Sequence, residues 1–174
     1  AYLLENEFSV SSYVPIEKMP YHNPYNFSET YTKAYHYLVN ERKLDFEIID
    51  LLCRKNYIRQ ETEHDNAVFQ WVKFGSVVGS NIKSTNPNSS FKIISSNSES
   101  NFGFNIMIGE PSQVKDIYFF EAAVDALSYW SFNKDTIRDT MLVDLEGVKV
   151  ESFINFQQYA QNLGVRLPDP SHLH

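Results

Sequence analysis

The stretch from Lys115 to Phe132, KDIYFFEAAVDALSYWSF, most constrains the fold because it places a strand, a turn and a helix within a few residues of one another. Its first half, Ile117 to Phe120, is an aromatic and β-branched run without alternation, which is typical of a strand covered on both faces. The residues after Glu121 are good helix formers with the spacing of a helix packed on a sheet. The pattern therefore predicts a strand–helix unit with Glu121 at the junction.

Two acids, Glu121 and Asp125, are the candidate functional residues of this unit. Ligands of open α/β sheets bind outside the carboxyl ends of the strands, where Glu121 is expected. Asp125 follows four residues later, so the two carboxylates are predicted to share one helix face. Such a pair can hold a hard divalent cation, or leave one acid for proton transfer. An acid in a first helical turn also complements the helix dipole, and this purely structural interpretation stays open.

The preceding region predicts two helices followed by antiparallel strands. The second helix begins near Asp45 and ends at Asn56, and its apolar stripe includes the single cysteine, Cys53, which is expected to be a buried thiol. From residue 66 to residue 108 the apolar period changes to two, which predicts a meander of about four strands. Three prolines in residues 1–27 favour an extended aromatic arm that packs on the main body, with stacking on bases as the alternative.

Beyond the central helix, residues 140–145 predict a second buried strand and residues 151–163 a further helix that stops at Gly164. The predicted fold class is α+β, with two N-terminal helices and an antiparallel β-meander packed on a partial parallel α/β region. The expected divisions of the chain are the arm at 1–27, the helical pair and meander at 28–112, and the α/β region at 113–174.

Composition limits the function classes. A hydrophobic content of 43% predicts a compact chain, and the net charge of -7 excludes nucleic-acid binding by bulk electrostatics. No apolar run approaches the length of a membrane span, and the cysteine content fits a reducing cytoplasm, so a cytoplasmic protein that does not insert in membranes is expected. One basic group is the candidate for phosphate contacts, although the acids between its members also fit an ordinary solvated face: Arg42, Lys43, Arg54, Lys55 and Arg59.

The segment FFEAAVDALSYW resembles the opening of a TOPRIM domain, the metal-dependent module shared by bacterial primases, topoisomerases and related nucleases. More closely, the chain resembles primase-like proteins of Gram-positive plasmids and conjugative elements, in which a domain of unknown function precedes a TOPRIM-like domain. The further segments that carry this resemblance are ERKLDFEIIDLLCRKNYI, NAVFQWV, SFKIISSNS and NFGFNI.

The resemblance implies nucleic-acid processing for a mobile element, with primase-like, Mg²⁺-dependent phosphoryl transfer. Glu121 would be the catalytic acid or base, Asp125 would help to hold the metal, and the basic group would bind DNA, either single-stranded or as primer–template. Other conjugation or replication proteins are expected partners. The alternative is a non-catalytic DNA- or protein-binding or scaffolding domain in which Glu121 is structural.

One part of the TOPRIM pattern is missing from the chain. A TOPRIM domain binds Mg²⁺ with an Asp-x-Asp pair at the end of a later strand, whereas the nearest pattern here, Asp144-Leu145-Glu146, follows the second strand. The resemblance implies that a strand with this pair begins after His174. The chain is therefore expected to be a piece of a longer protein, and to be inactive by itself.

Overall fold

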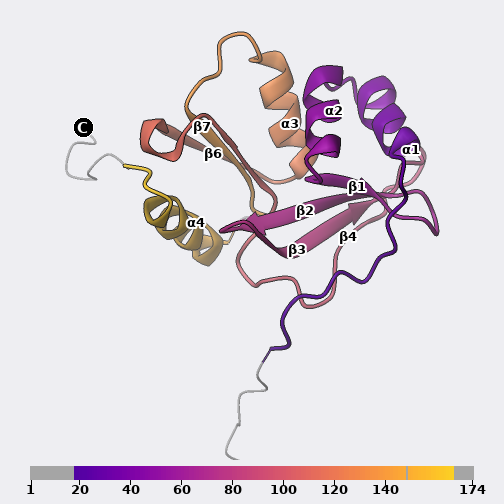
Figure 1. Cartoon of the computed structure of the whole chain (residues 1–174), viewed down its shortest axis with the longest axis horizontal. Helices are drawn as coiled ribbons and strands as arrows, with labels where there is room; N and C mark the ends of the chain where they lie inside the picture. The colour runs from indigo at the N-terminus through magenta and orange to yellow at the C-terminus, as the bar shows by residue number, and fades with distance from the viewer. Residues whose placement is uncertain (1–17, 148, 167–174) are drawn as a thin grey trace, which may run out of the picture.

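The computed structural model describes residues 18–147 and 149–166 and contains two β-sheets with helices around them (Figure 1). Helix α1 (Thr32–His36) continues into a π-helical turn (Tyr37–Glu41), and α2 (Phe46–Arg54) follows. The side chain of Asp45 caps α2 by accepting hydrogen bonds from the backbone N–H groups of Glu47 and Ile48. Asn56 has a φ of 62° beyond the end of α2, which confirms the predicted limits of this helix.

The first sheet is antiparallel, in the order β1-β2-β3-β4. Its strands are β1 (Ile58–Gln60), β2 (Ala67–Lys73), β3 (Ser76–Lys83) and β4 (Lys92–Ile94). The four-strand meander predicted for residues 66–108 is wrong at its end, because the run near residue 105 leaves this sheet. The short strand β1, which follows α2 directly, takes the remaining place by pairing with β2.

The second sheet is mixed, in the order β5-β7-β6. It contains β5 (Asn105–Ile108), β6 (Asp116–Phe120) and β7 (Thr140–Asp144). Strands β6 and β7 are parallel, as the strand–helix–strand pattern predicts, whereas β5 runs antiparallel to β7. Every residue of β7 is buried, because β7 has a neighbouring strand on both of its edges. The fold is thus α+β, and β5 makes the sheet mixed instead of purely parallel.

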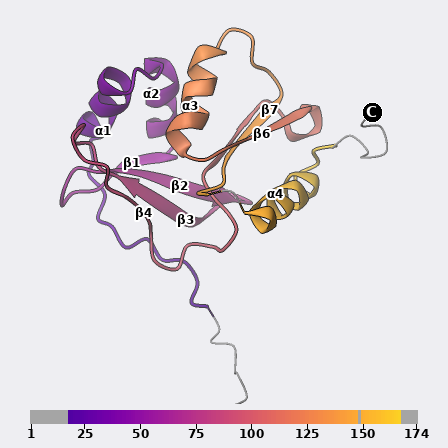
Figure 2. The same ribbon diagram turned by 180° about the vertical axis from the view of Figure 1, so that it is seen from behind.

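Helices α3 (Ala123–Phe132) and α4 (Val150–Asn162) cover opposite faces of the second sheet (Figures 1 and 2). The ring of Tyr129 in α3 lies 5.1 Å from that of Tyr118 and 5.5 Å from that of Phe120. The ring of Phe153 in α4 lies 4.7 Å from that of Phe119, between them in the strand. Alternate strand residues point to opposite faces, so the two helices lie on different sides of β6.

One buried cluster of side chains connects the two sheets. Phe69 of β2 packs edge-on against Phe104, with 5.4 Å between the ring centroids. Cys53 is buried in the same cluster, as predicted, and this burial, with a smaller contribution from the charge of Asp50, raises the pKa of its thiol to about 12. Within the part of the chain that the structure describes, no helix is both long enough and apolar enough to cross a membrane.

The described part of the N-terminal arm packs on the first sheet, as the sequence predicts. The hydroxyl groups of Tyr21 and Tyr25 hydrogen-bond to those of Ser80 and Ser95, each at 2.8 Å. These contacts fix the tyrosine side chains on the sheet, so they favour packing over base stacking for these two rings. Residues 1–17 of the predicted arm lie outside the described residues.

Candidate functional site

Glu121 stands at the predicted junction, between the last residue of β6 and Ala122, the N-cap of α3. Its side chain is exposed, and so is that of Asp125 in the first turn of the helix. The two carboxylates are expected from the sequence to share one face of the helix. They do not, because Glu121 precedes the helix. Residues 18–147 and 149–166 contain no group of three acidic, histidine or cysteine side chains placed to hold a metal ion. Glu121 and Asp125 alone therefore do not make a Mg²⁺ site.

An apolar hollow of about 450 Å³ opens beside Glu121. Among the described residues that line it, Glu121 and Lys149 are charged, and the others are Phe119, Phe120, Leu145, Val150 and Phe153. Much of this apolar surface faces solvent, with Val150 70% exposed and Phe153 40% exposed. Glu121 thus lines a hollow whose other walls are mostly exposed apolar side chains.

Two further acids, Asp144 and Glu146, lie at the same end of the second sheet as Glu121. Asp144 pairs with Phe120 in the register of β7 and β6, and the N–H group of Leu145 donates to the carbonyl of Phe120 at 2.9 Å. Asp144 is completely buried. The parallel strands therefore place an exposed acid and a buried acid at neighbouring strand ends.

The acids Asp144 and Glu146 form a buried pair whose hydrogen bonds are incomplete. Asp144 Oδ1 accepts a hydrogen bond of 2.8 Å from the backbone N–H of Glu146. Asp144 Oδ2 and Glu146 Oε1 are buried without a partner, whereas Glu146 Oε2 lies 2.9 Å from Nζ of Lys92 in β4. One lysine faces two carboxyl groups, so a second positive charge or a proton is needed for neutrality.

A proton supplies that balance at neutral pH. Burial first, and then the side chain of Glu146 through hydrogen bonding and charge, raise the pKa of Asp144 to about 8. The backbone N–H of Glu146 and the nearby charge of Lys92 oppose this shift. A proton shared between the two carboxyl groups also gives each unpartnered oxygen a partner. The sequence signal for this pair is the acid that ends the apolar run TMLVD, but nothing in the sequence indicates that distant Lys92 joins it.

The structure separates the predicted basic group instead of gathering it. Arg42 and Lys43 precede α2, whereas Arg54 and Lys55 lie at its other end, and a helix of 9 residues is about 13 Å long. Arg59 comes from β1. The five residues therefore do not form one continuous phosphate-binding patch.

Two members of the group already have partners within the protein. Nε of Arg54 lies 2.8 Å from a carboxylate oxygen of Asp50, one turn earlier in α2. The guanidinium of Arg59 lies 4.3 Å from the centre of the Phe27 ring. Both contacts are the ordinary environment of a surface cation, so they give no special support to phosphate binding at these positions.

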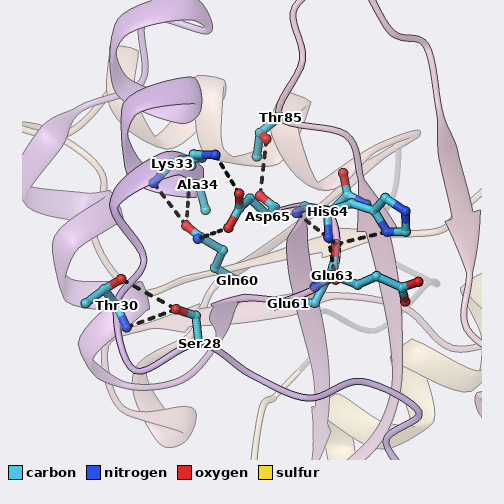
Figure 3. Close-up of polar contacts among 11 residues, drawn as sticks. Ser28, Thr30, Lys33, Ala34, Gln60, Glu61, Glu63, His64, Asp65 and Thr85 are labelled. Carbon is cyan, nitrogen blue, oxygen red and sulfur yellow. Dashed lines mark hydrogen bonds and ion pairs between the residues drawn. The ribbon is translucent and has the colours of Figure 1, made fainter.

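The first sheet has its own buried acid, Glu61, which is fully hydrogen-bonded (Figure 3). Its carboxylate accepts hydrogen bonds from the backbone N–H groups of Glu63, His64 and Asn66 at 2.7–3.1 Å. Nearby, the side chain of Gln60 accepts from the N–H groups of Lys33 and Ala34. Glu61 thus holds the turn between β1 and β2, which is a structural role.

Comparison with known proteins supports part of the resemblance. Residues 36–110 match the family described as protein of unknown function (DUF3991). The chain is 31% identical over 166 residues to pXO2-78, an uncharacterized Bacillus anthracis protein whose name refers to plasmid pXO2. The alignment covers 90% of this chain and 47% of the relative, so the chain spans about half of that protein's length. No solved structure matches. The chain is thus similar both to a family of unknown function and to a plasmid-associated protein.

Proposed function

We propose that this chain is part of a nucleic-acid-processing protein of a mobile genetic element, with TOPRIM-like, Mg²⁺-dependent phosphoryl transfer in the complete protein. DNA is the proposed substrate, and conjugation or replication proteins are the proposed partners. The similarity to a plasmid-associated relative about twice as long supports the first part of this proposal. The exposure of strand β6 supports the second part, a TOPRIM-like region that is complete only in the longer protein.

The observation that carries the proposal is the exposure of β6. Its sequence, DIYFF, is typical of a strand covered on both faces, yet Tyr118 is 40% exposed and no residue of β6 is fully buried. Among the strands that the structure describes, β7 is its only neighbour. The contrast with β7, which is buried throughout, indicates that β6 lacks a neighbouring strand that its composition requires.

The positions of the helices predict where that strand lies. Crossovers between parallel strands are right-handed, so a crossover through α3 on one face and a crossover through α4 on the other proceed in opposite directions. The other edge of β7 is already occupied by β5. A parallel strand that follows α4 would therefore pair with the open edge of β6. That arrangement makes the end of β6 a topological switch point, with Glu121 at the position where ligands bind.

In this proposal Glu121 takes or gives the proton at the reacting hydroxyl or phosphate group. The exposed position of its carboxylate leaves it accessible to a substrate. Mg²⁺ would be held chiefly by acids of the further strand, because the described residues do not form a metal site, and Asp125 would help to orient it. Lys149, which lines the same hollow, would contact a phosphate group.

The test is Glu121→Gln in the complete protein. Polymerising or cleaving activity with Mg²⁺ is expected to fall at least about 100-fold, because the amide cannot transfer the proton. Glu151→Gln, an equal change at an exposed acid in the first turn of α4, is expected to keep the activity. Unchanged activity in Glu121→Gln would overturn the proposal and favour the alternative of a binding or scaffolding domain.

A further inference from the structure

The most exposed large apolar side chains near the junction of α2 and α3 are two phenyl rings. Phe132, the last residue of α3, is 91% exposed, and Phe46, the first residue of α2, is 57% exposed. Neither ring is needed to fill the core at that exposure. Exposed aromatic rings on a folded surface indicate a binding surface when polar groups surround them.

Two cations lie beside the Phe132 ring. Arg42 and Lys43 line a hollow of about 240 Å³ together with Phe132 and the hydroxyl-bearing residues Ser128 and Ser131. Both cations are exposed, and neither takes part in an ion pair with another described residue. The hollow thus combines two cations without an ion-pair partner among the described residues, hydroxyl groups and an aromatic ring, together with the carboxyl group of Asp45.

One acid, Asp45, also lines this hollow, and it is paired with Lys134, which follows α3. Lys134 Nζ lies 3.1 Å from Asp45 Oδ2 and also binds the carboxylate of Glu47. These carboxylates, Glu47 first and then Asp45, raise the pKa of Lys134 by hydrogen bonding. Lys134 therefore compensates one of the two negative charges at the start of α2. With Arg42 and Lys43 included, these five side chains keep one net positive charge for an outside anion.

Hydrogen bonds through the Ser131 hydroxyl also hold the start of α2 against α3. The backbone N–H of Asp45 donates to Ser131 Oγ at 2.9 Å, and that hydroxyl donates to the carbonyl of Leu127 at 2.8 Å. The start of α2 is thereby fixed on the last turns of α3. The Phe132 ring and the two cations come from different elements, but these bonds hold the elements in one arrangement before any ligand binds.

We propose that this surface, defined by Arg42, Lys43 and Phe132, binds a short stretch of single-stranded nucleic acid. A base would stack on Phe132, and the adjacent phosphates would contact Arg42 and Lys43, as in other single-strand binding sites. Because the net charge is -7, the electrostatic contact is restricted to this local group of cations. This binding goes beyond the proposed function, because it does not require catalysis at Glu121, and it replaces the five-residue basic group as the nucleic-acid contact.

The test is fluorescence anisotropy of a labelled oligothymidylate with this chain at low salt. Phe132→Ala is expected to weaken binding about tenfold, within the range measured for loss of one stacked base. Arg42→Gln is expected to weaken binding and to lower the slope of log affinity against log salt by about 0.7, the value for one phosphate contact on a single strand. Arg166→Gln is the matched control, because this exposed arginine follows α4 in the chain, and α4 lies away from α2 (Figure 1). The variant is expected to bind as the wild type does.

Several outcomes would overturn the inference. These are no binding by the wild-type chain, an equal loss in Arg166→Gln and Arg42→Gln, or duplex DNA that competes as well as the single strand. An oligouridylate that binds better than the oligothymidylate would support the surface and identify RNA as its ligand. Glu121→Gln is expected to bind normally, so a failure of catalysis and a failure of this surface are distinguishable. Circular dichroism of Phe132→Ala checks that the fold is retained.

Discussion

Each sheet contains a buried acid, but the two acids differ in how completely they are hydrogen-bonded. In the first sheet, Glu61 is 3% exposed and its carboxylate accepts backbone hydrogen bonds from three residues of the following turn (Figure 3). In the second sheet, Asp144 is fully buried, and one of its oxygens has no partner. Both acids end or follow a strand, and both are within a few residues of a turn.

The hydrogen bonding of Glu61 therefore stabilises the fold, whereas the burial of Asp144 does not. Backbone N–H groups stabilise the charged form of Glu61 where it lies, so the acid stabilises the turn. Asp144 meets a second carboxyl group, that of Glu146, and depends on a proton and on Lys92 for neutrality. Unsatisfied buried acids of this kind gather at functional sites, and this pair lies at the sheet end where Glu121 is found.

The largest predicted effect is a loss of stability as pH rises. Asp144 keeps its proton in the folded chain up to a pKa of about 8, whereas in the unfolded chain it loses the proton near its ordinary value of 3.8. The folded state therefore binds more protons between these values, and the free energy of unfolding falls as pH rises through this window. The slope for one proton is at most about 1.4 kcal/mol per pH unit, so the sum from pH 5 to pH 8 reaches several kcal/mol.

Asp144→Asn is the control for that prediction. The amide can donate to Glu146 as the protonated acid does, so the variant is expected to match the wild type near pH 5 and to be more stable at pH 8. Urea unfolding of both proteins at each pH measures the difference. Parallel pH profiles for the two proteins would show that Asp144 does not hold the proton.

The substitution Glu61→Ala, which removes the fully hydrogen-bonded acid, is expected to have the next largest effect on stability. The N–H groups of the turn would lose their acceptor, and buried Asn66 would lose a bond of 3.0 Å. We expect a cost of about 3 kcal/mol in the free energy of unfolding, measured by urea unfolding. A cost below about 1 kcal/mol would contradict the structural role of Glu61.

Lys92→Met gives the smallest effect of the three. The substitution removes the cation 2.9 Å from Glu146, but the Lys92 side chain is 29% exposed, so water replaces part of the lost interaction. We expect a cost of about 2 kcal/mol at pH 8 and less at pH 5, because Asp144 keeps its proton at pH 5 and the pair then carries less negative charge. A cost that does not depend on pH would indicate that Lys92 acts through packing alone.

Local patterns in the sequence predict the individual elements well. The stops of α2 at Asn56 and of α4 at Gly164 follow from the left-handed backbone that these residue types accept. The start of α2 near Asp45 and the strand–helix junction at Glu121 follow from the change in apolar pattern. Pairing between distant strands is not predicted in this way. The apolar sequence of β5 is compatible with pairing in either sheet. In the structure β5 pairs with β7, a partner that its own sequence does not indicate.

The candidate site is predicted less completely than the fold. Glu121 could be placed from its own strand and helix, but the carboxyl pair of Asp144 and Glu146 depends on Lys92, which comes from the other sheet. The basic group shows the opposite error, because residues near one another in the sequence are separated by the length of α2. Charge counts along a chain do not show which charges share a surface.

The most direct test of the account is amide hydrogen exchange in β6, measured in this chain and in the complete protein. The account predicts that the amides on the open edge of β6 exchange quickly in this chain and are strongly protected in the complete protein, where a further strand would pair with them. Strand β4, the other edge strand with exposed apolar residues, serves as the internal control and should exchange alike in both proteins. Rapid exchange of the same β6 amides in the complete protein would contradict the account, because Glu121 would then not lie at a switch point.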